Sequence, residues 1–245
     1  MSKRYLLGAF SVLAVWSCSH TPIHVNRHLT IGSAANADEV RWTPDPKRGR
    51  ASNTLSGGRR GAVSATCAQG DHSLRPAVTL LVPEEAIALT TKAQPTLVWY
   101  VEGNQAAEME FVLLHPEHAD PIYTKKIQSA IGLVEVTLPE SAALEVGVPY
   151  RWTVSVTCDH DNFSVHTRSL VERVEMPNAA PNTSVMSSFE QASFYASQGI
   201  WYDALNLLID AYRQDAQIAV LQEFRSLLRQ INTDMSIEPS LAGKS

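Results

Sequence analysis

Four histidines and two neighbouring aspartates are the residues best suited to metal chemistry in this 245-residue chain. They are His115, His118, His160 and His166, with Asp159 and Asp161. Imidazole and carboxylate groups are ligands that zinc prefers. The segment 159–162 is also typical of a polar hairpin turn, and His115 stands beside Pro116 in a second polar loop. A metal site is therefore an alternative, and we predict no metal and no cofactor.

The three cysteines, Cys18, Cys67 and Cys158, carry the second kind of chemistry. Cys18 falls in the leader described below, which leaves Cys67 and Cys158 as a pair. In an exported protein such a pair predicts a disulfide, because two thiolates supply only half of a tetrahedral zinc shell. Closing so long a loop would stabilise the chain by roughly 4 kcal/mol. Two unrelated buried thiols are the alternative.

Catalytic patterns are weak. The chain contains no Gly-x-Ser-x-Gly motif for a serine nucleophile. Glu84 and Glu85 are adjacent, so on a strand their side chains would point to opposite faces. Glu108 and Glu110 would share a face, but charged pairs are common on the solvent-exposed face of a sheet. We predict that the protein is not an enzyme. An uncharacterised hydrolase is the last alternative, and it would require the histidines and aspartates to converge.

The N-terminus predicts export. Lys3 and Arg4 precede an apolar run over 5–16, which is too short to span a bilayer and is typical of a secretory signal. Residues 15–18 approximate a lipobox, which would make Cys18 a lipidation site, and 35–37 offer a small-x-small cleavage pattern instead. We predict a signal peptide or lipoprotein leader over 1–37, and a periplasmic or cell-envelope location with membrane contact only through that leader or a lipid anchor.

The net charge of −5 gives no general case for nucleic-acid binding. Basic residues nevertheless gather ahead of the folded part, within a stretch rich in Gly, Ser, Arg and Pro. We predict a disordered basic linker over 38–66, which could also touch an anionic lipid or wall polymer.

From residue 76 onward, the elements that must position these residues are short strands. Eight β-favouring runs separated by turn residues predict a β-sandwich domain over 67–177; the runs are 78–82, 87–91, 96–101, 109–114, 122–127, 133–137, 150–158 and 165–174. Alternation over 150–158 predicts one buried and one wet face. Leu144, Gly147 and Tyr150 have the spacing of a tyrosine corner, which resembles immunoglobulin and fibronectin domains and places Trp99 in the core of the facing sheet.

After the boundary at 177–182, helical periodicity predicts a tetratricopeptide-like segment over 186–232 with about three helices, followed by a disordered tail over 233–245. Gly199 is expected to end the first helix. Trp201 is expected in the core, which leaves Tyr202 and Tyr212 as the candidate partner surface. One repeat cannot bury its own apolar faces, so we expect it to dock on the sandwich, on a partner or on another copy. The predicted fold class is α+β.

Several blocks resemble a known family; they include 80–83, 95–101, 110–113, 144–152, 158–159 and, most specifically, 199–205. The chain resembles domain of unknown function 928, found mainly in cyanobacteria, from about residue 57 to residue 231. The resemblance implies an exported protein and supplies no activity, cofactor or functional residue.

These observations favour a non-enzymatic envelope protein that acts as a protein-interaction or scaffold module with a protein partner. A cell-wall or polysaccharide-binding module is the first alternative, supported by the basic linker and by aromatic residues that the sandwich could expose.

Overall fold

The computed structural model describes residues 39–45, 64–66, 77–103, 108–128, 131–158, 163–177, 182–231 and 233. All of them lie in one compact unit, Asp38–Ser245. The leader predicted over 1–37, with Cys18, lies outside the described residues, as does the predicted tail except Thr233.

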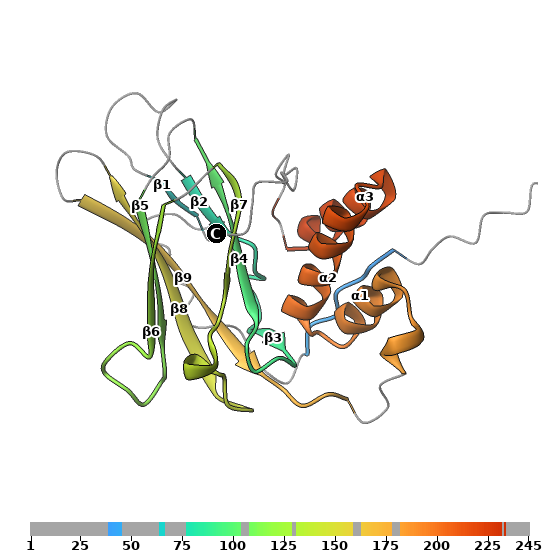
Figure 1. Ribbon diagram of the computed structural model, residues 1–245, viewed down its shortest axis with the longest axis horizontal. Coiled ribbons are helices and arrows are strands. Elements are labelled where there is room, and N and C mark those ends of the chain that lie inside the picture. Colours follow the sequence, from blue (N-terminus) through green and yellow to red (C-terminus); the bar gives the residue numbers. More distant parts are fainter. Residues whose placement is uncertain are drawn as a thin grey trace, which may run out of the picture. The chain divides into compact units, whose positions relative to one another are not determined.

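The described strands form two sheets (Figure 1). One sheet has four strands in the order β1-β2-β4-β7, and the other has five in the order β3-β9-β8-β5-β6. The strands are β1 (Ser64–Thr66), β2 (Ala77–Leu80), β3 (Ala88–Thr90), β4 (Thr96–Glu102), β5 (Glu108–Leu114), β6 (Tyr123–Gln128), β7 (Gly132–Thr137), β8 (Pro149–Cys158) and β9 (Phe163–Arg173). Neighbouring strands pair antiparallel except β3 and β9, which are parallel.

Strands β2 to β9 confirm the eight predicted runs, with ends within two residues of the expected ones. Strand β1 differs, because it lies in the stretch predicted to be linker and pairs with β2. The predicted alternation of β8 is also confirmed: Trp152, Val154 and Val156 are buried, whereas Arg151 and Thr157 are exposed.

An aromatic core joins the two sheets. Trp99 of β4 stacks on Phe111 of β5, with ring centroids 6.1 Å apart and planes 9° from parallel. It also tilts against Trp152 of β8 at 6.2 Å. All three side chains are fully buried, and such offset pairs add to the free energy of area burial. The predicted place of Trp99 in the core is therefore confirmed.

The predicted corner is present where β8 begins. The Tyr150 hydroxyl accepts a hydrogen bond from the backbone N–H of Glu145 at 3.2 Å. Gly147 lies between them with φ at +79°, a left-handed conformation that glycine adopts at no steric cost. Its N–H donates to the carbonyl of Arg173 at 2.8 Å, which ties the corner to the end of β9.

The C-terminal segment contains three α-helices, α1 (Ser188–Ser197), α2 (Trp201–Gln214) and α3 (Ile218–Arg229), in agreement with the prediction. Elsewhere in the described part of the chain, two 3₁₀ turns are present, η2 (Glu140–Ala142) between β7 and β8 and η3 (Thr183–Val185) ahead of α1. A capping box between Ser187 and Glu190 begins α1. A Schellman motif ends it: Gly199 has φ at +74°, and the Ile200 N–H donates to the Tyr195 carbonyl at 2.9 Å.

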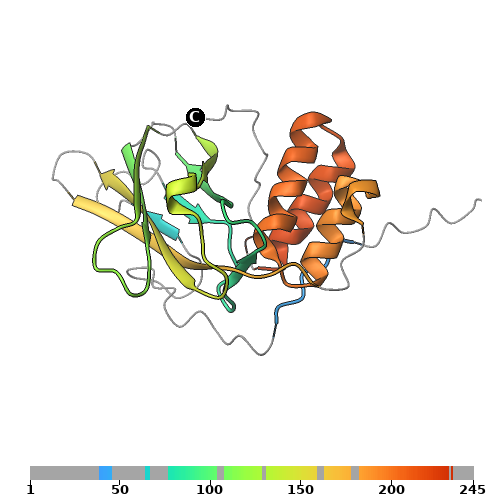
Figure 2. The same ribbon diagram turned by 60° about the horizontal axis from the view of Figure 1, so that its bottom comes forward.

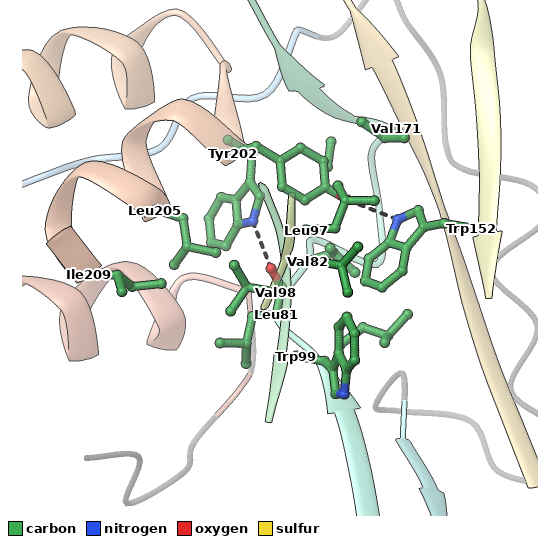
Figure 3. Close-up of a cluster of buried hydrophobic side chains, with 14 of the residues drawn as sticks. Leu81, Val82, Leu97, Val98, Trp99, Trp152, Val171, Tyr202, Leu205 and Ile209 are labelled. Carbon is green, nitrogen blue, oxygen red and sulfur yellow. Dashed lines mark hydrogen bonds between the residues drawn. The ribbon is translucent and has the colours of Figure 1, made fainter. Parts of the chain in front are cut away.

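Helix α2 packs against β3 and β4 (Figures 1 and 2). In Figure 3, Leu205 and Ile209 of α2 point toward Leu81 and Val98, and all four are buried. Val98 faces away from the aromatic core, so the helices cover the outer side of β4. The sequence analysis left open whether the apolar faces of the helices pack on the sandwich, on a partner or on another copy of the chain. In the structure they pack on the sheets of the same chain. Among the described residues, every helix is too short or too polar to cross a bilayer.

Candidate functional site

The first turn of α2 lies against the sheets, and several of its polar side chains form hydrogen bonds to them. The Trp201 indole N–H donates to the carbonyl of Leu81 at 2.8 Å. The Tyr202 hydroxyl accepts a hydrogen bond from the Trp152 indole N–H at 3.0 Å (Figure 3). Both α2 side chains are fully buried. Their polar atoms are therefore used to hold the helix on the sheets.

Asp203, the next residue, is a buried carboxylate with 2% of its surface exposed. Its Oδ2 accepts from the Thr90 hydroxyl at 2.7 Å and the Thr91 N–H at 3.1 Å. Its Oδ1 accepts from the Thr91 hydroxyl at 2.7 Å. Asp203 lies in the first turn of α2, where the helix dipole interacts favourably with a negative charge. A general base needs a lone pair that a substrate can reach, so we interpret Asp203 as a clamp between α2 and the end of β3.

Two further polar contacts fix how α2 lies along the sheets. The Asn206 side-chain amide donates to the carbonyl of Thr96 at 2.9 Å. About two turns further on, Arg213 pairs with Glu135 of β7 at 2.8 Å, and both side chains are mostly buried. The contacts of Asp203, Asn206 and Arg213 reach β3, β4 and β7 in turn, so the helix is held at three separate points.

Burial suppresses acid–base chemistry by the phenols of this cluster. Burial raises the pKa of Tyr202 far above the usual tyrosine value, and the hydrogen bond from Trp152 offsets only part of this effect. Burial, followed by the negative charge of Asp203, raises the pKa of Tyr195. Both phenols are therefore neutral at physiological pH. Both pack in the core, and the Tyr202 hydroxyl also accepts the hydrogen bond from Trp152.

A second cluster forms where residues 39–45, here called the strap, run along the helices. The Val40 N–H donates to Glu223 at 3.0 Å, and the Thr43 N–H donates to the Ala196 carbonyl at 3.0 Å. Gln230 contacts the strap twice, donating to the Val40 carbonyl at 2.8 Å and accepting from the Trp42 N–H at 2.9 Å. The prediction of a disordered linker over 38–66 is therefore wrong for 39–45, because the helices supply partners that composition does not reveal.

Residues 55–241 match the family described as Domain of Unknown Function (DUF928). The chain belongs to this family. The match contains every described strand and helix, including the α2 cluster, whereas the strap precedes it. Among curated proteins, none matches this chain.

The structure corrects the predicted partner surface of the DUF928 domain. Tyr202 is fully buried against Trp152 and cannot contact a partner while the domain is folded. The prediction assumed that Trp201 and Tyr202, about 100° apart on a helix, face opposite environments. In the structure both side chains face the sheets, Trp201 toward Leu81 and Tyr202 toward Trp152. Tyr212, further along α2, is half-buried and keeps a surface that a partner could reach.

The histidines are only partly brought together. His115 and His118 lie in one turn of the DUF928 domain with ring centroids 4.4 Å apart. The His115 Nδ1 accepts the Glu117 N–H at 3.1 Å, so this nitrogen is used within the turn. His166 lies on β9 opposite Ser155, away from that turn. Within the described ranges, no three His, Cys, Asp or Glu side chains gather into a potential metal site.

The remaining predicted groups lie outside the described residues. These are His160, Asp159 and Asp161, and the disulfide partner Cys67. Cys158 ends β8, and its side chain is outside the description, so the Cys67–Cys158 disulfide stays a prediction.

Sequence reasoning missed Asp203, Val40, Trp42 and Gln230. Asp203 follows Trp201-Tyr202 in the most specific family block, and its position in the first turn of an apolar helix was the available signal. Val40 and Trp42 were the only large apolar residues in their vicinity, spaced two apart as on an extended chain. Nothing in the sequence pattern distinguishes Gln230 from other helical glutamines.

Proposed function

We propose that this DUF928 protein is an exported, non-enzymatic module of the cell envelope that binds a protein partner as an interaction or scaffold domain. The observation that carries the proposal is the use of the buried polar groups. Asp203, Asn206, Tyr202 and Trp201 all bond the helices to the sheets. The helices are thus fastened to the sheets at several points, which suits the presentation of a surface better than the closure of a site around a substrate.

The finer fold assignment supports such a role. We infer an immunoglobulin- or fibronectin-like sandwich from the Tyr150 corner bond and from the strand order. In this reading β4 and β7 correspond to strands B and E, and β5, β8 and β9 correspond to C, F and G. We infer a tetratricopeptide-like relationship for the helices from the buried alanines Ala192, Ala196 and Ala204, which allow close helix approach. Both architectures serve widely in binding. A cyanobacterial origin is part of the same proposal.

We place the partner surface on the outer face of the five-stranded sheet. Here Arg151, Thr153, Ser155 and Thr157 of β8 alternate with the core residues, and neighbouring strands add charges of both signs. Glu110 of β5 stands opposite Lys126 of β6 and beside Ser155. Tyr212 of α2 is a second candidate contact. A face of mixed charge suits a folded protein partner better than a polyanion.

The polysaccharide alternative receives less support. Sugar-binding surfaces use exposed aromatic rings, and the described tryptophans of the sheets and helices, Trp99, Trp152 and Trp201, are fully buried. Of the described tyrosines, Tyr100, Tyr123 and Tyr212 are half-buried and the rest are buried. The basic run that could contact an acidic wall polymer lies mostly outside the described residues.

The test is affinity capture from an envelope fraction with the full-length protein, followed by identification of the partner and a binding measurement with the purified pair. Arg151→Glu reverses a charge on β8, the middle strand of the outer face, and Tyr212→Ala removes the second contact. Gln222→Glu on the exposed side of α3 is the control. We expect Arg151→Glu to abolish capture and the control to retain it. Equal recovery by the wild type and both surface variants would refute the proposed surface.

Export is tested separately by fractionating cells and measuring the mass of the mature N-terminus. A chain beginning at a lipidated Cys18 or after Ala37 supports export, and an intact leader in the cytoplasm contradicts it. Binding to wall polymer through the basic run would instead disappear at high salt, because exposed charges are screened.

A further inference from the structure

The strap is bound in a way that does not depend on its being part of the same chain. Three of its N–H groups and one carbonyl bond to the helices, through Glu223, Gln230 and Ala196. Gln230 alone contacts the Val40 carbonyl and the Trp42 N–H, which lie on the same side of an extended chain. Any extended peptide offers the same backbone groups at the same spacing. The helices thus present a ready-made set of partners for a strand-like ligand.

Side chains of the strap provide the selectivity. Val40 is fully buried, Trp42 is half-buried, and Arg41 between them is exposed. The Trp42 ring meets Trp201 edge-on, with centroids 5.5 Å apart and planes at 79°. Gly199 allows this approach, because a Cβ there would lie 2.9 Å from the Thr43 carbonyl oxygen. The contacts therefore select a β-branched apolar residue followed, two positions later, by a large aromatic one.

Trp42 is an imperfect occupant of this position. Its indole Nε1 is buried and has no hydrogen-bond partner among the described residues. A buried donor without an acceptor lowers affinity relative to a ring that carries no donor. Phenylalanine in the same place would keep the apolar and edge-on contacts without that loss. The strap is therefore an occupant that another peptide can outcompete.

The family match separates the site from its occupant. We call five residues the strap site: Ala196, Trp201, Glu223, Gln230 and Ser226, whose hydroxyl donates to the Glu39 carboxylate of the strap. All five lie within the matched residues 55–241, and the strap does not. Residues 46–63, which number 18, connect the strap to β1. A segment tethered by so few residues reaches its site at an effective concentration on the order of millimolar. The site is consequently closed in the intact chain against weaker or more dilute ligands.

We propose that the strap site is a peptide-binding site for an extended segment of another protein carrying a β-branched apolar residue and, two positions later, a phenylalanine-like aromatic residue, and that the strap occupies it in cis. This site is distinct from the outer face of the five-stranded sheet, so the two proposals fail independently. Displacement or cleavage of the strap opens the site.

The experiment uses the full chain with a protease cleavage sequence introduced within 46–63. The probe is a fluorescein-labelled peptide with the sequence of residues 38–46, and a second probe has phenylalanine at the position of Trp42. Binding is followed by anisotropy at low micromolar protein, before and after cleavage. We expect cleavage to tighten binding at least about tenfold, because the tethered competitor is lost. We also expect the phenylalanine peptide to bind at least about threefold more tightly than the tryptophan peptide.

Two variants locate the binding. Gln230→Ala in the cleaved chain should weaken binding about tenfold or more, because it removes both backbone contacts. Gln222→Ala, the same change at an exposed position within α3, the helix that Gln230 caps, should have no effect. Uncleaved Trp42→Ala should remain folded by circular dichroism and bind the probes more tightly than the uncleaved wild type.

Three results would overturn the proposal. In the first, the cleaved chain fails to bind either probe, or binds equally well with Gln230→Ala. In the second, cleavage or Trp42→Ala unfolds the helices, which would make the strap a part of the fold. In the third, the uncleaved chain forms dimers on sizing columns that Trp42→Ala abolishes, which would make a second copy of the chain the natural ligand.

Discussion

Asp203 allows a sharp test of how the helices are held on the sheets. Asp203→Ala removes the acceptor of three hydrogen bonds and leaves the Thr90 hydroxyl, which is fully buried, and two Thr91 donors without their partner. Asp203→Asn keeps the shape of the side chain and one carbonyl oxygen. Because the Thr91 hydroxyl can accept as well as donate, the asparagine amide can still bond to it.

The two substitutions should therefore differ in cost. Hydrogen bonds to charged groups contribute roughly 1.5–3 kcal/mol each, but the three bonds share one carboxylate, and its removal also ends the penalty of burying a charge. We expect Asp203→Ala to lower the free energy of unfolding by about 3 kcal/mol. Asp203→Asn loses the charge assistance and the favourable helix-dipole term, at a cost of about 1 kcal/mol.

The assay is denaturant unfolding at neutral pH, followed by tryptophan fluorescence. Asp210→Ala, an exposed aspartate on the same helix, is the matched control and should change the free energy by less than about 0.5 kcal/mol. If Asp203→Ala behaves like the control, apolar contacts alone hold the helices and the clamp interpretation is wrong. If the asparagine variant is as unstable as the alanine variant, the charge matters more than the hydrogen-bond geometry.

Three further predictions follow from the fold. Tyr202→Phe should cost about 1–2 kcal/mol at neutral pH, because it leaves the buried Trp152 N–H unpaired. The pKa of Tyr202 is raised in the folded state. The contribution of its hydroxyl to stability is therefore fully present below the ordinary tyrosine pKa of about 10 and is lost as pH rises above that value. In urea titrations, the stability of Tyr202→Phe should consequently decline less steeply at alkaline pH than that of the wild type. Gly199→Ala should destabilise the chain more than Gly147→Ala in thermal melts, since both glycines have positive φ but only the added Cβ at 199 meets backbone within 3 Å. Hydrogen bonds from Ser187 lower the pKa of Glu190. The contribution of the capping box to stability is therefore present above the ordinary glutamate pKa and is lost as pH falls through the lowered one. Glu190→Gln should reduce the fall in melting temperature over this acidic range, and an unchanged fall would argue against the capping box.

Local signals in the sequence predicted most of the fold. Strands β2 to β9 were predictable because each is a short β-favouring run between turn residues, and the turn at Gly199 because few other residues tolerate φ of +74°. Strand β1 was not predictable, because three residues in a Gly- and Arg-rich stretch carry no period of their own and pair only once β2 is in place.

The candidate sites were harder to predict for a related reason. Tyr202 was expected on the surface because a helix viewed alone has an inside and an outside. The sheets give α2 two inner sides, one facing Leu81 and one facing Trp152. The same holds for the strap, whose mostly polar composition predicts solvation unless a helix face offers acceptors and donors at matching positions.

The sequence by itself determined the α+β class, strands β2 to β9 to within two residues, the three helices, the Tyr150 corner and the family, because each depends on neighbours within a few residues or on a local block. Only the tertiary structure decided what covers the helices, where Asp203 finds its donors, and that Val40 and Trp42 lie against α2 and α3. Those contacts join residues more than 100 positions apart. The free energies of these contacts depend on how closely the two surfaces approach, and a local sequence pattern does not encode that distance.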